Sequence, residues 1–323
     1  MRIYITRAIP ADLTALQALA EVNIWPQRLP PSQQVLQAEV ENIDGLLCLL
    51  TDPIDAALLE AAPRLKVISQ MAVGYDNIDV AAATARRIPV GHTPGVLTDA
   101  TADFTWALLM AAARQVVTGD RFTRSGQWQT WEPALLLGPD VAGATLGIVG
   151  LGRIGQAVAK RAQGFGMRIF YHSRQPVEAA TEAALNAEWV PLEHLLQRSD
   201  FVTLHVPLTA ETHHLISSAQ LAQMQPTAIL INTARGPIVD AAALYEALKT
   251  EQIAGAALDV TEPEPIPLES PLLTLDNLII TPHIGSASRQ TRETMAEIAI
   301  ANLIAGLKDE PLPHCVNPMV YQR

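Results

Sequence analysis

Short apolar runs alternate with segments of helical periodicity through the first hundred residues. The apolar runs, which we predict to be strands, are residues 2–6, 45–50, 65–71 and 88–93. The segments between them, in which apolar positions recur every three or four residues, are 10–22, 31–42, 54–62 and 77–87. Strands that alternate with helices in this way predict a parallel sheet covered by helices on both faces.

A second series of the same kind begins near residue 145. Its predicted strands are 144–150, 168–172, 201–206, 227–232, 255–260 and 278–283, and helical patterns such as 152–165 and 239–252 separate most of them. Two successive series predict an α/β chain with two doubly wound parallel-sheet domains. The length of 323 residues allows two domains of ordinary size.

Two longer helical patterns complete the picture. Residues 98–122 are mostly apolar and are predicted to form one helix, with Thr98 or Asp99 as its N-cap. A helix this apolar must be buried on several sides, which suits a spine between domains or a contact between subunits. Residues 289–307 show the pattern of an amphipathic helix.

Composition and charge exclude several classes of function. A net charge of -11 argues against nucleic acid or an anionic membrane as a partner. The two cysteines, Cys48 and Cys315, form neither a disulfide framework nor a zinc-binding spacing, which is typical of a reducing compartment. The N-terminal stretch lacks the apolar core of a signal peptide, and no apolar run approaches the roughly 18 residues of a membrane span. We therefore expect a cytoplasmic protein with no bound metal.

A glycine-rich turn suggests a dinucleotide. Gly150, Gly152 and Gly155 follow a predicted strand and open a predicted helix. In such a turn the first glycine makes the tight bend, the second lets the backbone approach a pyrophosphate, and the third lets helix and strand pack closely. The neighbouring Arg153 and Ile154 are further candidates for cofactor contact.

The end of the next strand indicates which dinucleotide is preferred. NAD-binding folds usually place an acidic residue there, on the ribose hydroxyls, but this chain has Ser173 and Arg174. Serine can donate a hydrogen bond to a 2′-phosphate and arginine can pair with it, whereas a carboxylate would repel it. We therefore predict that NADPH is preferred and that NADH is the weaker cofactor. The alternative is that Arg174 is a solvated charge.

Three residues at predicted strand ends suggest catalysis. Arg235, Glu264 and His283 each follow a strand of the second series, and the carboxyl ends of parallel strands border the ligand crevice. Arginine can hold a carboxylate, histidine can exchange a proton near neutral pH, and a carboxylate can orient that histidine. Any one of the three alone is as readily a structural residue. Together they suit the reduction of a 2-oxo acid.

The motifs resemble a known family along nearly the whole chain. The stretches "AVGYDNID", "TPGVLTDATAD", "GLGRIGQAVAKRA", "NTARGPIVD", "ALDVTEPEP" and "TPHIGSAS" occur in the family order. The chain resembles the D-2-hydroxyacid dehydrogenases and, among them, is most similar to the glyoxylate/hydroxypyruvate reductases. The resemblance implies a flavodoxin-like substrate domain of residues 1–98 plus 284–323, into which a Rossmann-type cofactor domain of residues 99–283 is inserted. It also implies a cleft that closes on substrate and a homodimer joined through the cofactor domains.

The same resemblance implies a role for each site residue. Arg235 would bind the substrate carboxylate and carbonyl, His283 would be the general acid with Glu264 as its partner, and the amides of Val73 and Gly74 would clamp the carboxylate. Asp259 would hold the carboxamide of the nicotinamide. The other residues that would contact the cofactor are Pro207, Thr233, Gly285 and His283 itself.

Two further residues are implied near the substrate. Ser286 would contact a hydroxymethyl group. Trp131 lies in a stretch, "TWEPALLLGP", that in the resembling reductases reaches the partner subunit's active site. The alternative for Trp131 is packing in the dimer alone.

The expected activity is NADPH-dependent reduction of small 2-oxo acids, glyoxylate to glycolate and hydroxypyruvate to D-glycerate. A D-lactate-type or other D-2-hydroxyacid dehydrogenase is the alternative enzyme. A nucleotide-sensing corepressor is the alternative outside catalysis, because the trio occurs in those proteins too. An assay with a panel of 2-oxo acids separates these possibilities.

Overall fold

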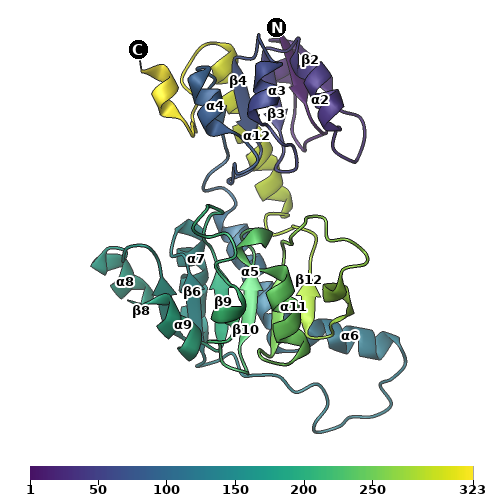
Figure 1. Cartoon of the computed structure of the whole chain (residues 1–323), viewed down its shortest axis with the longest axis vertical. Coiled ribbons are helices and arrows are strands. Elements are labelled where there is room, and N and C mark those ends of the chain that lie inside the picture. The colour runs from purple at the N-terminus through teal and green to yellow at the C-terminus, as the bar shows by residue number, and fades with distance from the viewer. Residues whose placement is uncertain (323) are drawn as a thin grey trace. The chain divides into compact units, whose positions relative to one another are not determined.

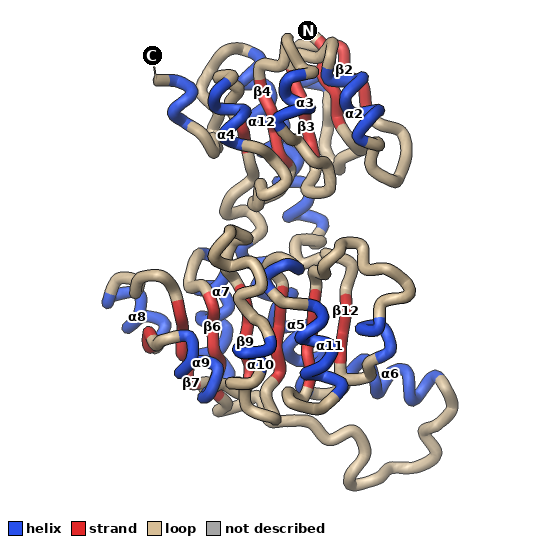
Figure 2. The backbone as a smooth tube through the Cα atoms, viewed as in Figure 1, coloured by secondary structure: helices blue, strands red, loops and turns tan. Residues whose placement is uncertain are grey.

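The computed structural model describes residues 1–322 and divides into two compact units. Unit 1 comprises Met1–Leu97 and the segment from Ala287 onward, and unit 2 comprises Thr98–Ser286. The boundaries in the chain therefore fall at 97/98 and 286/287, whereas the sequence predicts 98/99 and 283/284. Figures 1 and 2 show that each unit is a layer of strands with helices on both faces.

The sheet of unit 1 has five parallel strands in the order β2-β1-β3-β4-β5, which is the order of flavodoxin-like folds. The strands are β1 (Arg2–Ile5), β2 (Glu21–Ile24), β3 (Gly45–Cys48), β4 (Val67–Gln70) and β5 (Val90–Gly91). The short helices that follow them are α1 (Thr14–Gln17), α2 (Gln33–Val40), α3 (Ala56–Glu60) and α4 (Val80–Ala85). Strands β3 and β4 are buried throughout, as expected for strands covered on both faces.

The two faces of this sheet have different covers. Tyr4, Leu46 and Ile68 face a core shared with α2, α3 and α4. The other face packs against α12 (Arg289–Leu307), a helix near the C-terminus of the chain. The hydroxyl of Ser69 donates to the carbonyl of Ala299 over 2.7 Å and fixes this contact. The fold class of two parallel-sheet α/β domains is confirmed.

Unit 2 contains a parallel sheet of seven strands in the order β12-β11-β10-β9-β6-β7-β8. The strands are β6 (Thr145–Val149), β7 (Arg168–His172), β8 (Ala187–Trp189), β9 (Phe201–Leu204), β10 (Ile229–Asn232), β11 (Gly255–Leu258) and β12 (Leu278–Ile280). Strand order reverses at β6, from which the chain first runs to β7 and β8 and then returns to β9. This is the dinucleotide-binding topology with one additional strand, and its ligand crevice lies at the reversal.

The helices of unit 2 form a layer on each face of this sheet. One face packs against α9 (Leu192–Arg198), α10 (Ser218–Leu221) and α11 (Ala241–Lys249). The other packs against α5 (Thr98–Ala113) and α7 (Arg153–Ala162), and α8 (Ala179–Leu185) adds to this core near β7. Short 3₁₀ turns, η1 to η4, cover Gln163–Phe165, Gly236–Ile238, Pro271–Thr274 and Pro318–Tyr321.

The structure differs from the predicted secondary structure at three places. The predicted helix 10–22 extends too far, since its last two residues, Glu21 and Val22, begin strand β2. They pair with β1 at Arg2 and Ile3, and this pairing overrides the helical pattern. The three-residue strand β8 was not predicted, since it is too short to show alternation.

The third difference is at the predicted single helix 98–122. The chain instead forms α5 and then α6 (Val116–Arg124), with Gln115 between them at a positive φ of 53°. A residue in the left-handed conformation is a common helix end. Gly138 also packs against this end, where a Cβ would lie 1.9 Å from the carbonyl oxygen of Ala113.

We predict that Gly306→Ala destabilises unit 1. A Cβ at Gly306 on α12 would lie 2.4 Å from Cγ2 of Val67 on β4, so helix and sheet must separate. We expect a loss of about 1–3 kcal/mol, as for other overpacked cores, measured by chemical unfolding. Gly164→Ala is the control, because a Cβ there meets no atom within 4 Å. Equal stability of the two variants would contradict the prediction.

Candidate functional site

The glycine turn after β6 has the backbone that a pyrophosphate site needs. Gly150 has a φ of 97°, and a Cβ there would lie 2.8 Å from the backbone of His205. At Gly155 a Cβ would lie 2.2 Å from the carbonyl oxygen of Gly150, so this glycine allows α7 to begin close to β6. Gly152 is the N-cap of α7, and a Cβ on it would meet no atom within 4 Å. The turn therefore leaves an open approach to the helix N-terminus, as a bound dinucleotide requires.

The residues after β7 frame this turn. The hydroxyl of Ser173 accepts a hydrogen bond from the amide of Leu151 over 3.1 Å, so Ser173 holds the glycine turn and its hydroxyl hydrogen can point elsewhere. The indole of Trp189 donates to the carbonyl of Ser173 over 3.1 Å. Arg174, the next residue, is exposed, as are Arg153 and Pro207.

His205, just beyond β9, lies beside the turn and was not among the predicted site residues. Its Nε2 is 2.9 Å from the hydroxyl of Thr203, and burial lowers the pKa of His205 to about 3. This histidine is therefore neutral at physiological pH. It cannot serve as the proton donor of a reaction near pH 7.

The three predicted catalytic residues all lie in unit 2, just beyond strands β10, β11 and β12. Arg235 follows β10, and its guanidinium donates to the carbonyl of Ala234 over 2.8 Å. Nδ1 of His283 is 2.6 Å from Oε1 of Glu264, and both side chains are partly exposed. The structure thus places this imidazole–carboxylate pair at the carboxyl edge of the sheet that carries the glycine turn.

A buried carboxylate holds the loop on which His283 lies. Asp259 is 2% exposed and accepts hydrogen bonds from the hydroxyl of Thr281 over 2.7 Å and from the amides of Ile284 over 2.9 Å and Gly285 over 2.7 Å. His283 between them has a φ of 55°, a strained conformation of the kind that clusters at active sites. In the structure, the carboxylate of Asp259 accepts hydrogen bonds from this loop. Its predicted contact with the nicotinamide stays a prediction.

A close backbone approach also brings the β10 and β11 loops together. A Cβ at Gly236 would lie 1.9 Å from the carbonyl oxygen of Thr261, so only glycine allows the residue after Arg235 to touch the segment that leads to Glu264. Thr233, also beyond β10, has its hydroxyl 2.9 Å from that of Thr105 on α5. Glycine here was not recognised from the sequence, because the motif alone does not show which glycine lacks room for a side chain.

Val73 and Gly74 lie in unit 1, in the loop beyond β4. The carbonyl of Val73 is 3.0 Å from Nδ1 of His92, and that of Gly74 accepts from the side-chain amide of Gln70 over 3.3 Å. Gln70 also donates to the side chain of Asn77 over 2.6 Å. The loop is therefore fixed from both ends.

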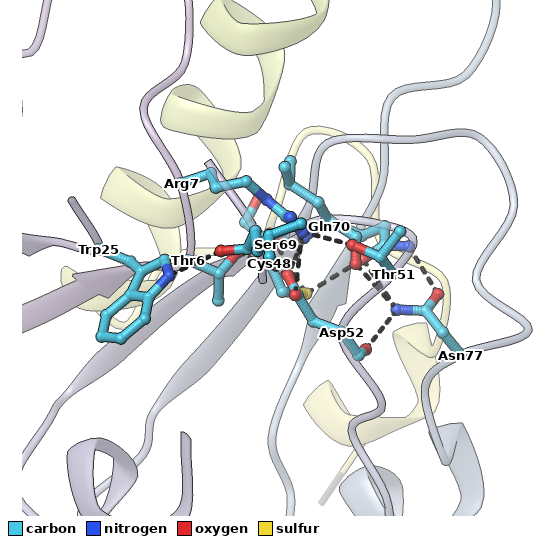
Figure 3. A network of polar contacts seen from close by, with 11 residues as sticks. Thr6, Arg7, Trp25, Cys48, Thr51, Asp52, Ser69, Gln70 and Asn77 are labelled. Carbon is cyan, nitrogen blue, oxygen red and sulfur yellow. Dashed lines mark hydrogen bonds and ion pairs between the residues drawn. The ribbon is translucent and has the colours of Figure 1, made fainter. Parts of the chain in front are cut away.

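Figure 3 shows how this fixation continues into a polar network that sequence reasoning missed. The side chain of Asn77 donates to the carbonyl of Asp52 over 2.8 Å. The buried Asp52 carboxylate in turn accepts from the hydroxyl of Thr6 over 2.5 Å and from the Arg7 guanidinium over 3.2 Å. The loop of Val73 and Gly74 thus rests on side chains from the ends of β1, β3 and β4. No local motif joins them, since they meet only when the sheet forms.

The remaining predicted residues are at the surface or near it. Ser286 is partly buried next to the buried Gly285. Trp131 is 78% exposed in the segment between α6 and β6. Within residues 1–322, none of the helices is both long and apolar enough to span a membrane.

Comparisons with known proteins agree with this arrangement. Residues 106–285 match the model of the D-isomer specific 2-hydroxyacid dehydrogenase NAD binding domain. The chain is 55% identical over 321 residues to a glyoxylate reductase of Korarchaeum cryptofilum, covering 99% of this chain and 96% of the relative. The chain is also 51% identical to a glyoxylate reductase of Thermococcus litoralis. That alignment covers 98% of this chain and 96% of the relative.

Solved structures give the same result. The TT0316 protein from Thermus thermophilus is 49% identical, with a TM-score of 0.92 over 98% of this chain and 100% of its own. An NADPH-dependent glyoxylate/hydroxypyruvate reductase from Sinorhizobium meliloti, in complex with NADP and malonate, is 34% identical, with a TM-score of 0.86 over 100% of this chain and 98% of its own.

The fold and the glycine turn together define a dehydrogenase that binds a nicotinamide dinucleotide. Within that class, the chain belongs to the D-isomer specific 2-hydroxyacid dehydrogenase family, as its match over more than half its length and its identity to full-length relatives show.

We predict that His205 makes the stability of unit 2 depend on pH. Its pKa is about 3 in the folded chain and about 6.5 when unfolded. The unfolded chain therefore takes up the proton first, and stability is lost as pH falls from about 6.5 toward 3. Chemical unfolding at pH 7.5 and pH 5 should show a larger loss in the parent than in His205→Gln, which can still hydrogen-bond Thr203. An identical loss in both proteins would refute this assignment.

Proposed function

We propose that the chain reduces small 2-oxo acids, glyoxylate to glycolate and hydroxypyruvate to D-glycerate, with NADPH as the preferred cofactor. The observation that carries the proposal is the 2.6 Å contact between His283 and Glu264 at the same sheet edge as Arg235 and the glycine turn. The printed names of the relatives, glyoxylate reductase and NADPH-dependent glyoxylate/hydroxypyruvate reductase, support the substrate class and the cofactor.

Each side chain has one task in this reaction. When bound, the reduced nicotinamide supplies a hydride to the carbonyl carbon of the substrate. His283 gives a proton to the carbonyl oxygen from Nε2, because Nδ1 is engaged by Glu264. Glu264 fixes the orientation of the imidazole through this contact. Arg235 binds the substrate carboxylate with a planar, always charged group.

The other predicted contacts belong to the same proposal. The amides of Val73 and Gly74 bind the carboxylate, and Ser286 contacts the hydroxymethyl group of hydroxypyruvate. The turn of Gly150, Gly152, Arg153, Ile154 and Gly155 holds the cofactor at its pyrophosphate, while Pro207, Thr233, Asp259 and Gly285 line the nicotinamide side. Ser173 and Arg174 bind the 2′-phosphate.

We further propose a homodimer joined through unit 2. The segment from α6 to β6 carries large apolar side chains that the single chain leaves exposed. Val116 is 57% exposed, Trp128 59%, Trp131 78% and Leu137 72%, and none of the described residues of α6 is buried. Exposed apolar residues concentrated in this way favour contact with another protein surface. Trp131 would then be buried by the partner chain, next to its active site.

The test of the activity is a panel of 2-oxo acids assayed with NADPH and with NADH. We expect kcat/KM to be highest for glyoxylate and hydroxypyruvate and lower for pyruvate, phenylpyruvate and 2-oxoisocaproate. A preference for pyruvate would favour a D-lactate-type enzyme, and no turnover with any acid would favour a nucleotide sensor.

His283→Asn shows whether the activity belongs to this site. Loss of a positioned proton donor should lower kcat by about 10²–10⁴-fold while binding of NADPH persists, because the glycine turn is unchanged. His194→Gln is the matched control, because it removes a histidine that packs against Phe170 from α9 and is not among the proposed site residues. Near-normal turnover of His283→Asn would remove this residue from the mechanism.

We predict that cofactor preference depends on Ser173 and Arg174. Charge-assisted hydrogen bonds to the 2′-phosphate contribute about 1.5–3 kcal/mol each, which corresponds to a preference for NADPH of roughly 10- to 100-fold. Arg174→Ala should weaken NADPH and leave NADH nearly unchanged, and Ser173→Asp should favour NADH by repelling the phosphate. The readout is kcat/KM for both cofactors.

Arg198→Ala, which removes another exposed arginine of unit 2, serves as the control for charge alone. If Arg174→Ala and Arg198→Ala change the NADPH value equally, Arg174 is only a solvated charge.

A further inference from the structure

A cluster of two histidines and one glutamate lies in unit 2 outside the residues assigned above. The ligand atoms of His213, His214 and Glu262 all lie within 4.8 Å of one another. Nε2 of His214 is 2.8 Å from Oε2 of Glu262, and Nε2 of His213 is 3.8 Å from Oε1 of the same carboxylate. His213 is exposed, whereas His214 and Glu262 are partly buried.

The backbone explains why two consecutive histidines point to the same place. In an extended chain, neighbouring side chains point in opposite directions. His214 instead has a φ of 51°, and this left-handed residue turns its ring toward that of His213. The two ring centroids are 4.0 Å apart, with the planes inclined by 30°.

Backbone contacts hold both parts of the cluster in place. The amide of His213 donates to the carbonyl of Thr209 over 3.0 Å, and that of His214 donates to the carbonyl of Pro237 in η2 over 2.7 Å. Glu262 follows Thr261, whose carbonyl lies against Gly236 of the same 3₁₀ turn. Both loops are therefore anchored on η2, so little conformational freedom remains to be lost when a ligand joins them.

The spacing suits a small divalent transition metal. Zn²⁺ binds imidazole nitrogen and carboxylate oxygen at about 2.0–2.2 Å in tetrahedral geometry, which places adjacent donor atoms roughly 3.3–3.5 Å apart. The two histidine nitrogens lie 2.8 and 3.8 Å from the two oxygens of the Glu262 carboxylate, and the three ligand atoms all lie within 4.8 Å of one another, so small side-chain rotations bring them to that spacing. Two imidazoles also favour zinc over magnesium or calcium, which prefer oxygen ligands.

We propose that His213, His214 and Glu262 form a zinc-binding site that links the loop after β9 to the loop after β11. Three protein ligands leave at least one coordination position for water. The ion replaces the hydrogen bond between His214 and Glu262 and neutralises the carboxylate. Because Glu264 lies two residues further along the same loop, the site adjoins the catalytic pair without sharing a residue with it.

No pattern in the sequence indicates this site. Glu262 is 48 residues from His214 in the chain, and neither histidine belongs to a spacing typical of zinc ligands. The three residues meet because β9, β10 and β11 are adjacent in the sheet.

The proposal is tested by calorimetric titration of the metal-free full chain with Zn²⁺ alone, without substrate or cofactor. We expect one ion per chain with a Kd on the order of micromolar, a higher midpoint of thermal unfolding with the ion, and no such effects with Mg²⁺. His213→Asn should weaken zinc binding at least tenfold and abolish the rise in the midpoint. His194→Gln, which removes a histidine elsewhere in the same unit, should leave both unchanged.

Two results would overturn the proposal. One is the absence of zinc binding at concentrations up to about 1 mM, because a site with three ligands should bind zinc much more tightly than that. The other is binding that survives in His213→Asn but is lost in His283→Asn, which would place the ion on His283 and Glu264 instead. The unfolding midpoint of each metal-free variant shows that a loss of binding is not a loss of folding.

Discussion

The loop of unit 2 that carries His283 depends on the buried carboxylate of Asp259. A carboxylate that is 2% exposed is costly unless its lone pairs are satisfied, and here one hydroxyl and two amides satisfy them. All three donors come from the loop that carries His283. The cost of burying this carboxylate is therefore offset when the loop adopts the conformation that brings all three donors to it. That conformation includes the strained φ of His283, and it presents the imidazole to Glu264.

The contact between Gly236 and Thr261 has a comparable effect on the neighbouring loops. It brings the segment after Arg235 against the segment before Glu264, at a distance that excludes any side chain. The two contacts together fix the three loops after β10, β11 and β12. The arrangement of Arg235, Glu264 and His283 is therefore set by backbone packing in the loops that carry them.

Most of the architecture could be predicted from the sequence, because buried parallel strands are short continuous apolar runs and glycine turns have a fixed spacing. The helix 289–307 was predicted with the observed bounds, since its amphipathic pattern is long. The pattern failed where tertiary contacts decide: at the edge strands β2 and β8, and at Gln115, which lies between α5 and α6. The trio at the strand ends could be named from sequence because it follows motifs. The network of Gln70, Asn77 and Asp52 could not, because its members are joined by the sheet alone.

The glycine turn illustrates how a residue can keep a structural role while its charge is free to change. Ser173 accepts the amide of Leu151, which is a structural task that aspartate could also perform. Serine and aspartate both supply the acceptor that the turn needs, but they differ in the charge that they place beside it. The charge next to the turn can therefore change at position 173 while the acceptor for the Leu151 amide is kept. The loops beyond β10 and β11 lack this freedom, because there the backbone contact itself excludes any side chain.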